Sequence, residues 1–146
     1  MDSESTSTPA RALLGWRLLA LVYDFFPVLG LWFAVAALFT LLHRDAVTGG
    51  WLGLVEFVAL WCVTGLYAVL SWRRGGATLG MRPWRLRVVS ADGGGASFAA
   101  LWKRYAVGTL SLLAGGAGFW SAPFDRERLT WHDRMSGTRM LRDTKA

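Results

Sequence analysis

Two carboxylates stand inside long apolar runs, where a charge is costly. Asp24 is the only charged residue from Leu18 to Leu42, and Glu56 interrupts the next apolar run. An acid inside a membrane-spanning helix must face protein, water or an opposite charge, so Asp24 is by default a candidate binding residue for a cation, a proton or a small polar ligand. Glu56 either continues a proton or cation relay at a second depth or simply reaches the outer headgroups.

Three further polar residues are candidates to accompany Asp24. Arg17 lies seven residues earlier, on the same helical face but about 10 Å away along the axis, so it either extends fully to Asp24 or binds a lipid phosphate. In an antiparallel helix pair Thr64 is level with Asp24, and a hydrogen bond between them would lock helix packing instead of building a ligand site. Asp133 is expected to accept backbone N–H groups or an Arg of the basic loop, and it also reaches Arg17 if the tail folds back.

The sequence contains no residue pattern typical of an enzyme active site, a nucleotide site or a zinc site. His132 and Asp133 are adjacent, so on a helix they do not face each other as a base and its partner would. The glycines of Gly75–Gly80 and Gly93–Gly95 lack the Lys-Ser/Thr of a phosphate loop. The two histidines are too far apart in sequence to suggest a zinc cluster. We therefore expect no enzyme, cofactor or metal.

The composition places these residues in a membrane protein. The chain has 146 residues, of which 53% are hydrophobic and 18% charged, with a mean hydropathy of +0.33. This is too apolar for an ordinary soluble domain and too rich in Trp and Phe for a disordered one. The formal net charge of +6 could indicate nucleic acid, but beside apolar spans it favours anionic lipid headgroups as the partner.

The expected fold is an all-α membrane protein with two full transmembrane helices, a third Gly-rich segment and a short cytoplasmic β-like element. The third segment either spans the bilayer or dips in and turns back near Gly115-Gly116, and we prefer the second because six basic residues follow it. As a single domain, the chain divides into a flexible tail 1–12, spans 17–42 and 51–72, a basic loop 73–104, the third segment 105–124 and a basic tail 125–146.

The basic loop 73–104 sets the expected orientation. By the positive-inside rule this loop is cytoplasmic, and with it the amino terminus. We predict a strand from Trp84 to Ser90 and a second strand, Thr138 to Leu141, that could pair beside it. Ser97 could cap the amphipathic helix that follows the first strand. Four basic residues are expected to face lipid phosphates: Arg73, Arg74, Lys103 and Arg104.

With these motifs in order, the chain resembles the RDD family of small bacterial membrane proteins. The Arg and the two Asp that name the family match Arg17, Asp24 and Asp133. Gly76–Arg82, followed by Leu86–Gly93, resembles the family's linker, although Ala77 and Met81 stand where polar or basic residues are usual. The resemblance implies a bacterial inner membrane location and a candidate transporter of an unidentified ligand, since some members are linked to cation/proton exchange.

The sequence thus predicts a transporter of a cation, proton or small polar ligand, with Asp24 assisted by Arg17 and Asp133. Two or three spans are too few to enclose a pathway, so this hypothesis includes a homo-oligomer. The alternative is a non-transporting scaffold or accessory subunit whose buried charges fix helix packing.

Overall fold

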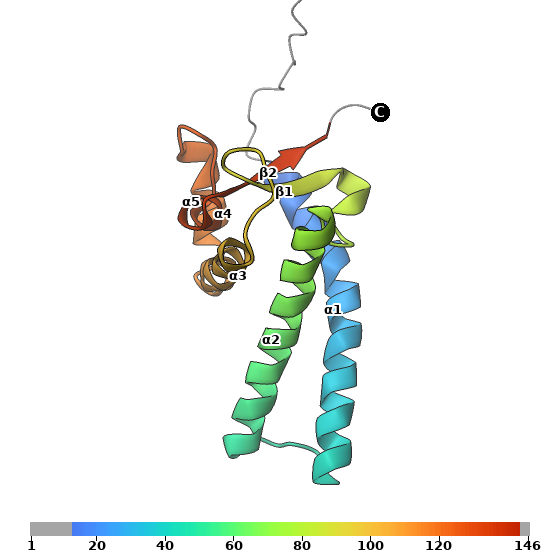
Figure 1. Ribbon diagram of the computed structural model, residues 1–146. Helices are drawn as coiled ribbons and strands as arrows, with labels where there is room; N and C mark the ends of the chain where they lie inside the picture. The colour runs from blue at the N-terminus through green and yellow to red at the C-terminus, as the bar shows by residue number, and fades with distance from the viewer. Residues whose placement is uncertain (1–12, 144–146) are drawn as a thin grey trace, which may run out of the picture.

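The computed structural model describes residues 13–143, so the predicted flexible tail 1–12 lies outside the described residues. Two long helices, α1 (Leu14–His43) and α2 (Gly50–Gly75), form an antiparallel hairpin (Figure 1). In the described part of the chain, these two helices are long and apolar enough to cross a membrane, with 30 and 26 residues. We call the end where α1 begins and α2 ends the arginine-rich end.

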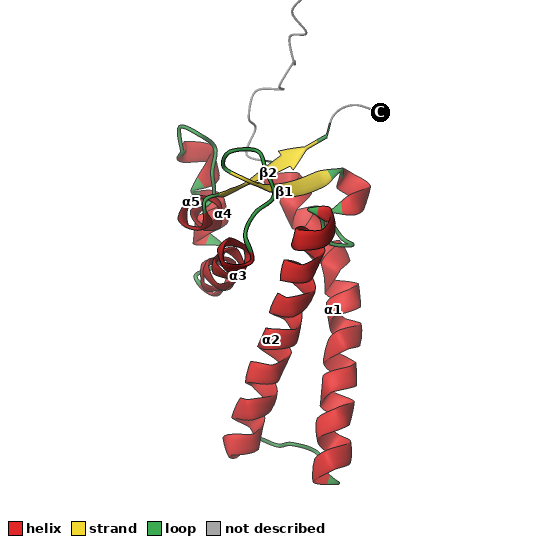
Figure 2. Ribbon diagram, in the orientation of Figure 1, coloured by secondary structure: helices red, strands yellow, loops and turns green. Residues whose placement is uncertain are grey.

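Residues 76–143 form a cap on the arginine-rich end (Figure 2). After the 3-10 helix η1 (Arg82–Trp84), Arg85 takes a left-handed φ of 55°, so the strand that the sequence predicted from Trp84 begins only at Leu86. The remaining elements are β1 (Leu86–Ser90), α3 (Phe98–Leu113), α4 (Ala117–Trp120), η2 (Ala122–Phe124), α5 (Trp131–Ser136) and β2 (Thr138–Arg142).

The predicted pairing of the two strands is confirmed. β1 and β2 are antiparallel, with Leu86 opposite Arg142 and Ser90 opposite Thr138. This pairing brings the end of the chain back to the linker that follows α2. Buried side chains from the hairpin and the cap pack together beneath it: Ala20, Val69, Ala77, Met81, Leu86, Val88 and Leu101.

The third apolar segment does not form one long helix. Ser97 caps α3 by accepting a hydrogen bond from the Ala100 N–H, at 3.2 Å, and α3 then runs without a break from the end of the basic loop into the 105–124 stretch. It ends at Leu113, and Gly115 and Gly116 turn the chain with φ values of 71° and 78°. Beyond this turn α4 has only four residues.

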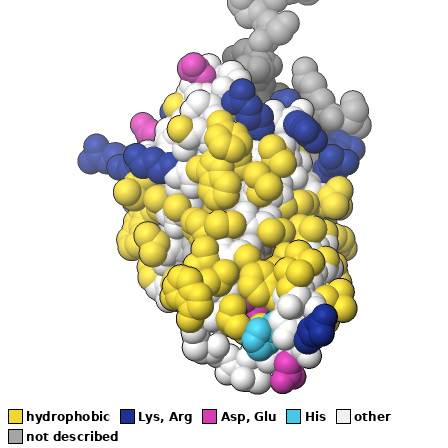
Figure 3. Space-filling model, turned by 60° about the horizontal axis from the view of Figure 1, so that its bottom comes forward, with side chains coloured by type: hydrophobic (Ala, Val, Ile, Leu, Met, Phe, Trp, Pro, Cys, Tyr) yellow, Lys and Arg dark blue, Asp and Glu magenta, His cyan; other side chains and the backbone are white. Residues whose placement is uncertain are grey.

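The outer faces of the hairpin are apolar. Phe33 and Leu42 are 70% and 76% exposed, as expected for side chains that contact lipid. Figure 3 shows hydrophobic side chains over most of this surface, with Lys and Arg gathered mainly along the rim at the opposite end from the loop joining α1 to α2.

Candidate functional site

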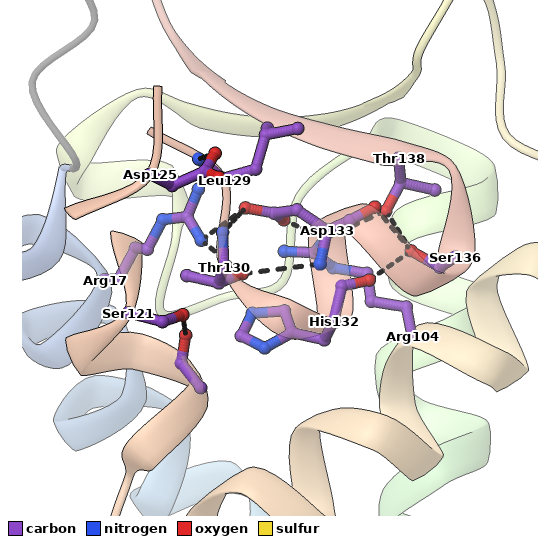
Figure 4. A network of polar contacts seen from close by, with 11 residues as sticks. Arg17, Arg104, Ser121, Asp125, Leu129, Thr130, His132, Asp133, Ser136 and Thr138 are labelled. Atoms are coloured by element: carbon purple, nitrogen blue, oxygen red, sulfur yellow. Dashed lines mark hydrogen bonds and ion pairs between the residues drawn. The ribbon is translucent and has the colours of Figure 1, made fainter. Parts of the chain in front are cut away.

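Asp133 is the centre of a buried polar cluster with Arg17, Arg104, Thr130 and Thr138, which we call the Asp133 cluster (Figure 4). Asp133 is the third residue of α5, and Thr130 caps that helix. The Thr130 hydroxyl accepts from the Asp133 N–H at 3.3 Å, while an Asp133 carboxylate oxygen accepts from the Thr130 N–H at 3.1 Å. This reciprocal capping box fixes the carboxylate at the start of α5.

Two arginines from other elements approach the same carboxylate. Arg17, near the start of α1, places Nη1 2.8 Å from Asp133 Oδ2, and Arg104 of α3 binds Oδ1. Arg17 also donates to Thr130 Oγ1 at 3.1 Å, and Arg104 to Thr138 Oγ1 at 2.9 Å. Arg17 and Arg104 are only 4% and 2% exposed. One carboxylate therefore ties α1, α3 and α5 together.

The predicted contact between Arg17 and Asp133 is confirmed, but the lipid-facing role expected of Arg104 is wrong. The side chain of Arg104 points into the cap, because α5 packs against the face of α3 that carries it. Its sequence neighbour Lys103 is exposed, as are Arg73 and Arg74 at the end of α2. These three cations make no ion pair with any carboxylate among residues 13–143.

The two arginines influence the protonation states of Asp133 and of its neighbour His132. Burial by itself would raise the pKa of Asp133, but the charges of Arg104 and Arg17 outweigh burial and hold that pKa well below its ordinary value. Burial, followed by the charge of Arg104, lowers the pKa of His132 to about 3. At neutral pH the cluster therefore holds an ionised carboxylate, and the adjacent His132 imidazole is neutral.

Asp24 lies in a second, separate polar cluster, which we call the Asp24 cluster. The half-buried carboxylate accepts hydrogen bonds from Tyr67 Oη at 2.7 Å, from the Thr78 hydroxyl, and from the Gly80 N–H at 2.8 Å. The Leu79 N–H in turn donates to Tyr67 Oη at 3.2 Å. Asp24 thus fastens α1 both to α2 and to the turn that follows α2.

The structure separates the residues that the sequence grouped into one site. Arg17 is held by Asp133 and not by Asp24. Thr64 does not bond Asp24, because its hydroxyl donates to Leu60 O and accepts from Trp32 Nε1, both at 2.8 Å. Glu56 is half-buried and makes no hydrogen bond or ion pair with another described residue.

Sequence reasoning anticipated a backbone N–H, an arginine of the basic loop and Arg17 as partners of Asp133, but it missed every partner of Asp24. Tyr67, Thr78 and Gly80 were not proposed for Asp24, although the last two lie within the Gly76–Arg82 motif. Thr130 was not proposed either, yet a Thr three residues before Asp133 is a capping-box signal. Among the described residues, no group of three or more His, Cys, Asp or Glu could hold a metal ion.

Comparison with known proteins gives a match to one family. A family model described as the RDD family matches residues 11–137, which is nearly the full chain and a range that contains Arg17, Asp24 and Asp133. Searches among curated proteins and among solved structures gave no match. With two apolar helices long enough to span a membrane and this match over most of its length, the chain belongs to the RDD family.

Proposed function

We propose that the protein is a non-transporting membrane scaffold or accessory subunit, in which buried charges fix the cap on a two-helix membrane anchor. One observation carries this proposal: hydrogen-bond donors from distant parts of the same chain surround both carboxylates. Asp24 accepts from three such donors, and Asp133 from two arginines and a backbone N–H. A buried carboxylate whose hydrogen-bond donors come from its own chain serves to fix the packing of helices and loops.

The chemistry around Asp24 argues against a cation site there. A transported cation needs several oxygen ligands that are free to approach it. The groups within hydrogen-bond distance of the Asp24 carboxylate are two hydroxyls and a backbone N–H that donate to it, so its oxygens are already engaged. The Asp133 carboxylate likewise faces two guanidinium groups, which would repel a cation.

A second candidate function, transport of a proton or cation by a homo-oligomer, is favoured by Glu56. This half-buried acid lies inside α2 and has no hydrogen-bonding or ion-pair partner in the described part of the chain. In a homo-oligomer, a neighbouring copy could supply one, and Glu56 would then line a pathway between copies.

Ion flux in proteoliposomes tests the two functions against each other. The purified wild type, Asp24→Asn and Glu56→Gln would be reconstituted with a pH gradient and with a monovalent cation gradient. The scaffold predicts no flux above that of protein-free vesicles for any of them. Flux through the wild type that either variant abolishes, while its unfolding temperature in detergent is retained, would establish transport instead.

Stability measurements on the same samples test the packing role. Asp24→Asn keeps the size of the side chain but loses an acceptor, which leaves one of its donors unsatisfied and lowers the free energy of unfolding by about 1–3 kcal/mol. Asp45→Asn, at an exposed position in the loop between α1 and α2, is the matched control and should have little effect. Equal stability of the wild type, Asp24→Asn and Asp45→Asn would contradict a packing role for Asp24.

A further inference from the structure

The segment from α3 to η2 leaves the arginine-rich end of the hairpin and returns to it. Asp133, which follows this segment, binds both Arg104 near the start of the segment and Arg17 near the start of α1. Beyond Arg104, α3 continues only to Leu113, which is about 14 Å of helix against a hydrocarbon layer of about 30 Å. A chain that turns after so short a run cannot cross the bilayer, so this segment stays on one side of it.

α3 contacts α2 at a level between the arginine-rich end of the hairpin and its middle. Tyr105 Oη donates to the carbonyl of Trp61 at 2.8 Å. The rings of Trp102 and Tyr105 lie so close to Gly65 that a Cβ there would approach Trp102 to 2.5 Å. Gly65 precedes Arg73 by about 12 Å along the axis of α2. This contact therefore lies within the thickness of one leaflet.

The far part of the segment exposes large apolar side chains. Leu110 is 65% exposed, Leu113 80%, Trp120 60% and Phe124 90%. Large exposed apolar side chains at this density mark an interaction surface with a protein or a membrane. Continuity with the apolar faces of α1 and α2, at the depth set by Gly65, favours acyl chains as its cover.

The charged residues nearby are complementary to an anionic surface. Lys103 is exposed on α3, and Arg73 and Arg74 are exposed at the end of α2. None of these three cations has an ion-pair partner among residues 13–143. Exposed apolar side chains flanked by such cations are typical of segments that lie in the headgroup region of anionic membranes.

We propose that residues 98–124 form a wedge inserted into the leaflet at the arginine-rich end, with anionic lipid as its ligand. The acyl chains cover Leu110 and Leu113, while Lys103, Arg73 and Arg74 bind the lipid phosphates. The proposal is independent of whether the protein transports, because it concerns the outer surface of the cap and assigns no ligand to either carboxylate cluster.

Depth-dependent fluorescence quenching tests the apolar contact. In a Cys62→Ser background, Leu110→Cys and Leu113→Cys would each carry an environment-sensitive fluorophore in vesicles of phosphatidylcholine and phosphatidylglycerol. The matched control is Glu127→Cys, whose native side chain is 62% exposed and lies outside the apolar cluster. Nitroxide lipids labelled in the acyl chain should quench the first two labels at least twofold more than the control. Labels that these lipids do not quench, whether they face water or a second copy of the chain, would overturn the wedge.

Lipid selectivity tests the charged contact. The double variant Arg73→Gln with Lys103→Gln would be compared with Arg126→Gln and Arg139→Gln, which removes the same charge from exposed positions outside the proposed lipid contact. Each protein would be extracted from equimolar vesicles of the two lipids, and the retained lipids counted by mass spectrometry. The first variant should retain at least twofold less phosphatidylglycerol relative to phosphatidylcholine than the wild type. An unchanged ratio, or an equal loss in the control, would overturn anionic lipid as the ligand.

Discussion

His132 lies against two buried arginines, and this placement makes the stability of the protein depend on pH. An unfolded histidine takes up a proton near pH 6.5, whereas burial and the charge of Arg104 lower the pKa of His132 to about 3 in the folded state. Between these values the unfolded state binds a proton that the folded state does not. The free energy of unfolding therefore falls as the pH drops through this window, by up to about 1.4 kcal/mol per pH unit.

Replacing the imidazole should remove this dependence. His132→Phe keeps a ring beside Phe119, whose centroid lies 4.8 Å from that of His132, but it cannot take up a proton. We expect thermal unfolding in detergent between pH 6.5 and 4.5 to show a clearly smaller loss of stability for this variant. The depressed pKa of Asp133 does not obscure the comparison, because its contribution is fully present above the unfolded pKa of about 3.9 and is lost only as the pH falls below it.

An exposed histidine provides the control for this measurement. His43→Gln changes the last residue of α1, which is exposed and remote from the Asp133 cluster, so the slope of the wild type should persist. If His132→Phe and the wild type lost stability equally over this pH range, the assignment of the slope to His132 would be wrong.

Among the elements, the contact between α1 and the turn after α2 depends on a glycine. A Cβ on Gly80 would lie 2.2 Å from the carbonyl oxygen of Ala20 and 2.6 Å from the carboxyl carbon of Asp24. The first of these atoms belongs to a helix backbone and cannot move aside. Gly80→Ala should therefore push the turn away from α1 and weaken the hydrogen bond from the backbone N–H of residue 80 to Asp24. We expect it to lower the free energy of unfolding by about 1–3 kcal/mol.

Gly75→Ala is the matched control for this steric effect. No atom lies within 4 Å of the position that its Cβ would take, and the residue ends α2. Denaturant unfolding of both variants in the same detergent measures the difference. A similar stability for the two variants would show that the close approach at Gly80 does not hold the turn.

The elements that sequence predicts best are those encoded locally. The apolar runs predicted α1 and α2, alternation predicted β1 and its pairing with β2, and Ser97 predicted the start of α3. Lys103 and Arg104 show where local patterns fail. Both are basic and adjacent, and only the position of α5 decides which of them is buried.

The partners of Asp24 were beyond local patterns for a related reason. Thr78 and Gly80 follow Asp24 by 54 and 56 residues, with the whole of α2 between them. Helix depth placed Thr64 level with Asp24, but Tyr67 reaches the carboxylate instead and Thr64 turns to Trp32. By contrast, the pairing of Arg17 with Asp133 was predicted on the condition that the tail folds back to the end of the hairpin that carries Arg17.

In the whole molecule, the Asp133 cluster makes the hairpin and the cap one unit, and a double-mutant cycle can measure this. Arg17→Gln or Arg104→Gln alone leaves Asp133 with one cation and a neutral pair, whereas both together leave a buried carboxylate with no positive partner. The stability loss of the double variant should therefore exceed the sum of the single losses by at least about 1 kcal/mol. Arg87 pairs with a different carboxylate, that of Asp143, so Arg87→Gln combined with Arg104→Gln should be additive within about 0.5 kcal/mol. Additive losses would mean that Arg17 and Arg104 are not coupled through Asp133. Each arginine would then stabilise the protein by contacts of its own, and the shared carboxylate would not join α1 to the cap.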